Sequence, residues 1–167
     1  MLKEEQFKVL KTMSEVTNRM DLNMFAQKVN LNPNQTIQQI QELAKKGFLQ
    51  RVGGGYGITE KGKAALKAFT PVPKEMGFHF YYGINQPTDF TAQSLEEFYR
   101  FIKQVSVNSV EFHLYRGDFE NWLKEACKDA ALASEIGGIR AGGLKGEDLR
   151  KELLEVLDAK YGIHELL

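Results

Sequence analysis

The sequence has little of what cross-links, metal sites and membrane anchors require. One cysteine among 167 residues leaves no internal disulfide possible. That cysteine and three widely separated histidines have no zinc-type spacing, so we expect no metal and no other cofactor. No apolar run approaches the roughly 18 to 20 residues that span a bilayer. The charged start MLKEEQFKVLK has no apolar signal core, and we therefore expect a cytoplasmic protein.

The chain also lacks net charge, but its charges are unevenly distributed. Residues 1–70 hold 11 basic and 6 acidic residues, a net charge of +5, whereas residues 71–167 hold 11 basic and 16 acidic residues, a net charge of −5. The segment TPVPKEMG at 70–77 lies where the sign changes, and its prolines and glycine are typical of a linker. We expect a domain over 1–70, a linker over 71–77 and a second domain over 78–167.

Three helices are predicted in the first domain. Over 3–16, apolar residues recur at three-residue spacing between charged ones, as on an amphipathic helix. Asp21 is a suitable N-cap for a short helix over 22–29. Asn32, followed by a proline at the first helical position, favours a third helix over 33–46.

After the third helix the periodicity changes from helix to strand. FLQRV alternates apolar and polar residues, GGG at 53–55 permits a tight turn, and YGIT returns as a second strand. TEKGKAALKAF then predicts a closing helix with Thr59 as its N-cap. Helix, helix, turn, helix, hairpin and helix follow one another as in a winged helix-turn-helix.

The segment LAKKGFLQRVGGGYGITEKGKAAL at 43–66 resembles the recognition-helix end and wing of many archaeal and bacterial winged-helix regulators. The resemblance covers about residues 3–69. It implies that the third helix lies in the major groove of double-stranded DNA and that the wing reaches the backbone or minor groove. It also implies a homodimer on a palindromic site.

Carried onto this sequence, the resemblance suggests residues that contact DNA. Asn and Gln can form bidentate hydrogen bonds with adenine, and cations contact phosphates. The candidates are Asn34, Gln35, Gln38 and the flanking Gln39 on the third helix, Lys45 and Lys46 at its end, and Arg51, Tyr56 and Lys61 of the wing. Our hypothesis is a DNA-binding transcriptional regulator. The alternative is a non-catalytic adaptor, in which these amides are a solvated face and the winged helix and acidic tail bind proteins.

The second domain is predicted to be mostly helical, so the whole chain is expected to be mainly α with a small β-wing, an α+β fold. FHFYYGI at 78–84 indicates a buried strand, and NQPTDFTAQ at 85–93 a loop. Ser94 with Glu97 forms a capping-box pattern at the start of a helix. Residues 106–117 remain open between strand and helix.

Further helices are predicted towards the end of the chain. Asp118 is a good N-cap for a predicted helix that carries Trp122. Another helix holds Leu132 and Ile136, and GGIRAGGLKG at 137–146 is expected to break it. A final amphipathic helix follows and stops at Gly162.

SLEEF at 94–98 and SVEFHLYRGDFENWL at 109–123 resemble a family of unknown function common in archaea, over roughly 78–157. The resemblance implies a shared fold and no particular activity.

The cluster around His113 admits a structural and a functional interpretation. A histidine near a carboxylate can act as a base with an orienting partner. However, no nucleophile elbow and no phosphate-binding loop occurs, so we do not expect an enzyme. His113 is expected to pack between helices. Alternatively, the second domain holds a pocket for a small-molecule or protein effector, with the candidates His79, Tyr81, His113, Asp118 and Trp122.

Overall fold

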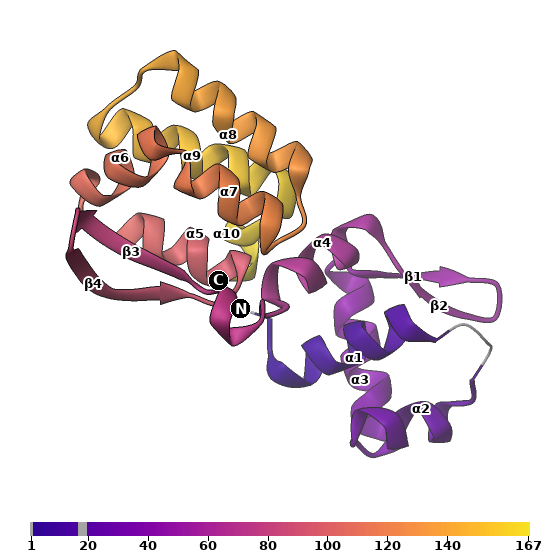
Figure 1. Ribbon diagram of the computed structural model, residues 1–167. Helices are drawn as coiled ribbons and strands as arrows, with labels where there is room; N and C mark the ends of the chain where they lie inside the picture. The colour runs from indigo at the N-terminus through magenta and orange to yellow at the C-terminus, as the bar shows by residue number, and fades with distance from the viewer. Residues whose placement is uncertain (1, 17–19) are drawn as a thin grey trace. The chain divides into compact units, whose positions relative to one another are not determined.

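The computed structural model describes residues 2–16 and 20–167. It is mainly helical, with two separate two-stranded antiparallel sheets, which confirms the predicted α+β class. The chain forms two compact units, drawn in Figure 1. The first unit contains the residues up to Lys67 together with His164–Leu167, and the second contains Ala68–Ile163. The last four residues, expected in the second domain, thus group with the first.

The first unit has the topology of a winged helix-turn-helix. Its elements are α1 (Glu4–Glu15), α2 (Leu22–Val29), α3 (Pro33–Lys45), β1 (Leu49–Val52), β2 (Gly55–Ile58) and α4 (Glu60–Phe69). The hairpin β1–β2 extends from the helices as the wing (Figure 1). Buried apolar side chains from α1, α2, α3, β1 and α4 form the core, among them Leu10, Phe25, Leu43, Leu49 and Ala65.

Side-chain caps set the turn between α2 and α3. The Asp21 carboxylate accepts a hydrogen bond from Met24 N at 2.9 Å, and Asn32 Oδ1 accepts one from Gln35 N at 2.8 Å. Both caps were predicted. Asn30 ends α2 in the left-handed conformation, with φ of 58°, which turns the chain sharply towards α3.

The segment ITEKG closes the base of the wing. Thr59 Oγ1 donates to Gly47 O at 2.6 Å and accepts from Gly62 N at 3.0 Å, as expected of the N-cap of α4. A Cβ on Gly62 would lie 2.2 Å from Phe48 O, so only glycine lets α4 approach the backbone of Phe48, just before β1, this closely.

The second unit packs helices on a β-hairpin. Its elements are the 3₁₀ turn η1 (Lys74–Met76), β3 (Phe78–Gly83), β4 (Gln86–Ala92), α5 (Leu95–Gln104), α6 (Val107–Arg116), α7 (Asp118–Glu125), α8 (Ala130–Gly142) and α9 (Gly146–Tyr161). A short α10 (Ile163–Leu166) follows, and its residues from His164 onwards belong to the first unit. Helix α6 contacts β3 and α5 contacts β4, while α8 and α9 pack on the other helices of this unit (Figure 1).

The predicted loop at 85–93 is wrong, because most of it is strand β4. Asn85, with φ of 57°, makes the turn, and β4 then pairs antiparallel with β3. Pro87 lies opposite Tyr81 in the register. A proline is tolerated there because each strand of a two-stranded sheet has one unpaired edge.

Two further segments, for which the sequence left the structure open or predicted a break, are helical. Residues 107–116 form α6, with Ser106 as the N-cap, so the apolar alternation there does not produce a strand. The expected break at 137–146 is wrong in its position, since α8 continues through Gly138 to Gly142 and stops only at Gly143, whose φ is 73°.

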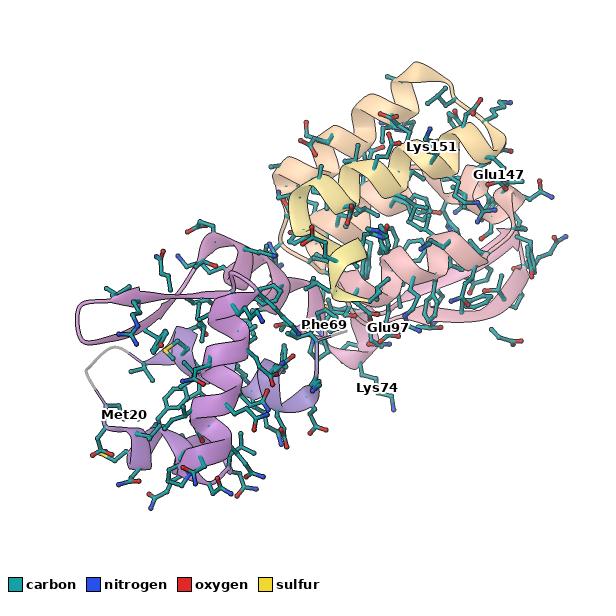
Figure 2. The ribbon with its side chains drawn as sticks, turned by 180° about the vertical axis from the view of Figure 1, so that it is seen from behind. Met20, Phe69, Lys74, Glu97, Glu147 and Lys151 are labelled. Atoms are coloured by element: carbon teal, nitrogen blue, oxygen red, sulfur yellow. The ribbon has the colours of Figure 1, made fainter. Side chains whose placement is uncertain are left out.

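Two polar clusters hold α9 in place. The Arg150 guanidinium donates to Ile102 O at 2.7 Å and Val105 O at 2.6 Å, which satisfies carbonyls at the end of α5. The buried Asp129 carboxylate accepts hydrogen bonds from Lys160 Nζ at 2.6 Å and from the Tyr161 hydroxyl. Lys151, by contrast, is exposed on α9 (Figure 2).

Candidate functional site

Three of the predicted DNA-contacting amides lie exposed on α3. Asn34, Gln35 and Gln38 are all in the first two turns of this helix. Gln35 Oε1 also accepts from Asn32 N at 3.2 Å, and Gln38 Nε2 lies 3.4 Å from Glu42 Oε1. These contacts are local and exposed, so both side chains can exchange them for a ligand at low cost.

Gln39 does not belong to this exposed surface. Its side chain is 7% exposed, on the same helix face as Thr36, Ile40 and Leu43. The prediction that it contacts DNA is therefore corrected: the face of α3 that packs on the core includes this glutamine.

The cations predicted to contact DNA, apart from Lys61, lie at the end of α3 and on the wing. Lys45 and Lys46 are exposed at the end of α3. On the wing, Arg51 is exposed and lies opposite Tyr56 in the β1–β2 register. Its guanidinium carbon lies 5.5 Å from the Tyr56 ring centroid, a cation–π distance that orients the side chain.

Lys61 has a different position from the other predicted cations. Its Nζ donates to Lys46 O at 2.9 Å, lies 3.2 Å from a Glu165 carboxylate oxygen and sits 4.9 Å from the Phe48 ring centroid. A cation here stabilises the negative end of α3 and ties α4 to the C-terminal residues of the chain. The ammonium group of Lys61 is thus engaged within the first unit.

The five predicted pocket residues come together in the second unit. They line one pocket of about 670 Å³ between β3, α6 and α7. Sequence reasoning missed other lining residues, chiefly Phe78, Phe112, Asn121 and Glu125. Helical spacing could have revealed some of them, since Asp118, Asn121, Trp122 and Glu125 follow one another at i, i+3, i+4 and i+7 on α7.

His113 connects β3 to α7 at the floor of this pocket. Its Nε2 accepts a hydrogen bond from Tyr81 N at 2.7 Å, and Nδ1 lies 2.9 Å from Asp118 Oδ2. Because Nε2 accepts, the neutral ring carries its proton on Nδ1 and donates it to Asp118. Burial lowers the pKa of His113, although the bond to Asp118 opposes this effect. Both nitrogens of His113 are therefore occupied in the neutral form, so this ring has no free lone pair with which to abstract a proton.

Asp118 does not cap α7 as predicted. The N-cap is Gly117, in the left-handed conformation, and Asp118 is the first residue of the helix. Its Oδ2 faces His113 and lies 3.5 Å from Arg116 Nε. The side chain is thus turned from the helix end towards α6.

The tryptophan and arginine of the pocket are also fixed by neighbours. Trp122 Nε1 donates to Met76 O at 2.7 Å, which anchors the 3₁₀ turn η1 on α7. The Arg116 guanidinium carbon lies 4.7 Å from the Phe112 ring centroid. The aromatic rings that line the pocket are in contact with one another, and the ring centroids of Phe78 and Trp122 lie 5.8 Å apart.

Comparison with family models decides the classification of the chain. Residues 60–158 match a Family of unknown function, DUF5752, over more than half of the sequence. The chain belongs to the DUF5752 family. Comparison with curated proteins and with solved structures gave no significant match.

The DUF5752 match includes α4 and every residue of the aromatic pocket. This confirms the resemblance of the second domain to a family of unknown function and extends it upstream to Glu60. The predicted DNA-contacting residues, apart from Lys61, lie in 1–59 and outside the match.

None of the helices within residues 2–16 and 20–167 is long and apolar enough to cross a membrane. No group of three or more His, Cys, Asp or Glu side chains in these ranges is placed to hold a metal ion.

Proposed function

We propose that the first unit of this DUF5752 protein binds double-stranded DNA and that the protein acts as a transcriptional regulator. The observation that carries the proposal is the exposed row Asn34, Gln35 and Gln38 at the start of the second helix of a helix-turn-helix. In such folds the first turns of that helix face base edges in the major groove.

Each group has a chemical role in the proposed complex. The amides pair with the N6 and N7 edge of adenine, so the preferred site contains A·T pairs. Lys45, Lys46 and Arg51 contact phosphates on either side of the recognition helix. The net charge of +5 over residues 1–70 favours a polyanion, while the acidic second unit provides dimer contacts or binds an effector.

Selection from randomised duplexes with the full chain tests this function. A homodimer enriches a palindrome whose half-sites lie about one helical turn, roughly 34 Å, apart. In the Gln38→Ala variant, the base preference is relaxed at one position of each half-site. The control is Gln104→Ala, which removes an exposed amide from α5 and leaves the selected sequence unchanged. No enrichment over the input library, or the same preference in Gln38→Ala, contradicts the proposal.

A specific observation favours one second candidate, a protein-binding adaptor. The first unit exposes apolar side chains, with Met24 53%, Ile37 38% and Val52 58% accessible. Ile37 and Val52 border an apolar groove of about 640 Å³ between α1, α2, α3 and the wing. Exposed apolar surface of this kind marks protein contacts. An Ile37→Ser variant that loses a protein partner while the wild type binds no duplex at low salt would favour the adaptor.

A further inference from the structure

The pocket of the second unit has walls made largely of aromatic rings. Phe78 and Trp122 are 6% and 8% exposed at its floor, and Tyr81 and Phe112 are half-buried at its sides. At about 670 Å³ it falls within the range of small-molecule sites. All of these residues lie in the second unit, so the pocket does not depend on the first.

The polar atoms of the floor are already satisfied by the protein. Both ring nitrogens of His113 bond to Tyr81 N and Asp118, and the Trp122 indole N–H bonds to Met76 O. A ligand therefore meets ring faces and edges there rather than hydrogen-bond donors. The electron-rich faces of aromatic rings attract cations.

The charges around the pocket have a negative balance. Arg116, Asp118 and Glu125 line it, and the Arg116 guanidinium is paired with Asp118 at 3.5 Å and packed on Phe112. Glu125 is exposed and has no ion-pair partner within the part of the chain that the structure describes. An anionic ligand would compete with Asp118 for Arg116 and approach Glu125, whereas a cation is attracted by Glu125 and by the −5 charge of residues 71–167.

We propose that this pocket binds a small organic cation, an amine with an aromatic or apolar body. The body packs against Tyr81 and the edge of Trp122, and the ammonium group lies towards Glu125 at the rim. The site shares no residue with the proposed DNA interface, and its occupation by an amine does not require DNA binding.

The single tryptophan of the chain reports on binding directly, because Trp122 lines the pocket. Three probes of similar shape separate charge from size: 2-phenylethylamine, 2-phenylethanol and 3-phenylpropanoate. Titrated into the full chain, with Trp122 fluorescence and saturation-transfer NMR as readouts, the amine binds about tenfold more tightly than the alcohol. The carboxylate binds most weakly.

A variant without the carboxylate charge of Glu125 tests where the ammonium group binds. Glu125→Gln weakens the amine about threefold to tenfold and leaves the alcohol unchanged. Glu135→Gln removes the same charge from an exposed position of α8 outside the pocket and leaves all three affinities unchanged. The proposal is overturned if neither readout detects the amine at millimolar concentration, if the alcohol or carboxylate binds as tightly as the amine, or if Glu125→Gln binds the amine like the wild type.

Discussion

The imidazole of His113 lies 2.9 Å from Asp118 Oδ2 and accepts the backbone N–H of Tyr81 at 2.7 Å on its other nitrogen. This side chain, 3% exposed, therefore joins the hairpin, α6 and α7 in its neutral form. Protonation would place a second N–H against the Tyr81 N–H and abolish that bond.

A loss of stability in mild acid follows from this geometry. The unfolded chain takes up a proton at the ordinary histidine pKa of 6.5, whereas burial lowers the pKa of His113 in the folded chain. Between those two values the unfolded state binds more protons, so the free energy of unfolding falls as pH drops below 6.5, by at most about 1.4 kcal/mol per pH unit. Above pH 6.5 the contribution of His113 to the free energy of unfolding does not change with pH.

Urea unfolding from about pH 7.5 to 5 measures this effect. His113→Gln is less stable than the wild type at neutral pH, and the difference narrows in acid. An equal acid dependence in the wild type and His113→Gln would show that His113 is not the group responsible.

Removing the charge of Asp129 is expected to destabilise the second unit by about 2–4 kcal/mol. This 5% exposed carboxylate accepts hydrogen bonds from Lys160, Tyr161 and the backbone of Leu132. Burial works against its ionisation, but these bonds hold its pKa below the usual value. In Asp129→Asn the Lys160 ammonium loses its partner.

Chemical denaturation checks this loss, with Glu155→Gln as the control because Glu155 is exposed and pairs with the exposed Lys151 at 3.9 Å. That control changes stability by less than about 0.5 kcal/mol. Equal stabilities of the two variants would refute a structural role for the Asp129 cluster.

Gly62→Ala is predicted to cost about 1–3 kcal/mol, because the added Cβ clashes with Phe48 O and the Ile58 side chain. Gly138→Ala is the matched control, since a Cβ there, in the middle of α8, would meet no atom within 4 Å beyond its chain neighbours and the backbone of its own helix. It is expected to stabilise by about 0.5–1 kcal/mol through helix propensity. Thermal unfolding of both variants measures these changes in stability. If Gly62→Ala were as stable as the wild type, the close contact between α4 and the wing would be wrong.

Lys61→Met separates a structural lysine from one that contacts DNA. The substitution removes the contacts to Lys46 O and Glu165 and should lower stability by about 1 kcal/mol. Under conditions where Lys61→Met and Arg51→Ala are both folded, Lys61→Met should bind the duplex more tightly than Arg51→Ala does. The opposite order of affinities would restore Lys61 to the DNA interface.

Local signals made the first unit largely predictable. Asp21 and Asn32 bond to the backbone positions that their place in the sequence suggests, and such caps depend on few distant contacts. Amide chemistry alone suggested that Gln39 is exposed, whereas helical spacing indicates its burial, because it lies three residues after Thr36 and four before Leu43.

The second unit was harder to predict because long-range packing overrides local preference there. The segment that holds Thr88, Phe90 and Ala92 forms strand β4 because it pairs with β3. In the sequence, the turn-forming residues around it indicated a loop instead. Gly138 is tolerated inside α8 because tertiary packing of the helix offsets its poor propensity. The five pocket residues were identified as candidates from their chemistry, yet their convergence depends on the contact of α6 with β3.

The salt dependence of duplex binding tests the DNA proposal most directly. Fluorescence anisotropy of the selected duplex with the full chain should give a plot of log affinity against log salt with a slope of about −3 per protomer, for phosphate contacts by Lys45, Lys46 and Arg51. Arg51→Ala should reduce the steepness by about 1, and Lys63→Ala, on the exposed side of α4, should not change it. No binding at low salt, or affinity that does not change with salt, would contradict a DNA-binding role for the winged helix.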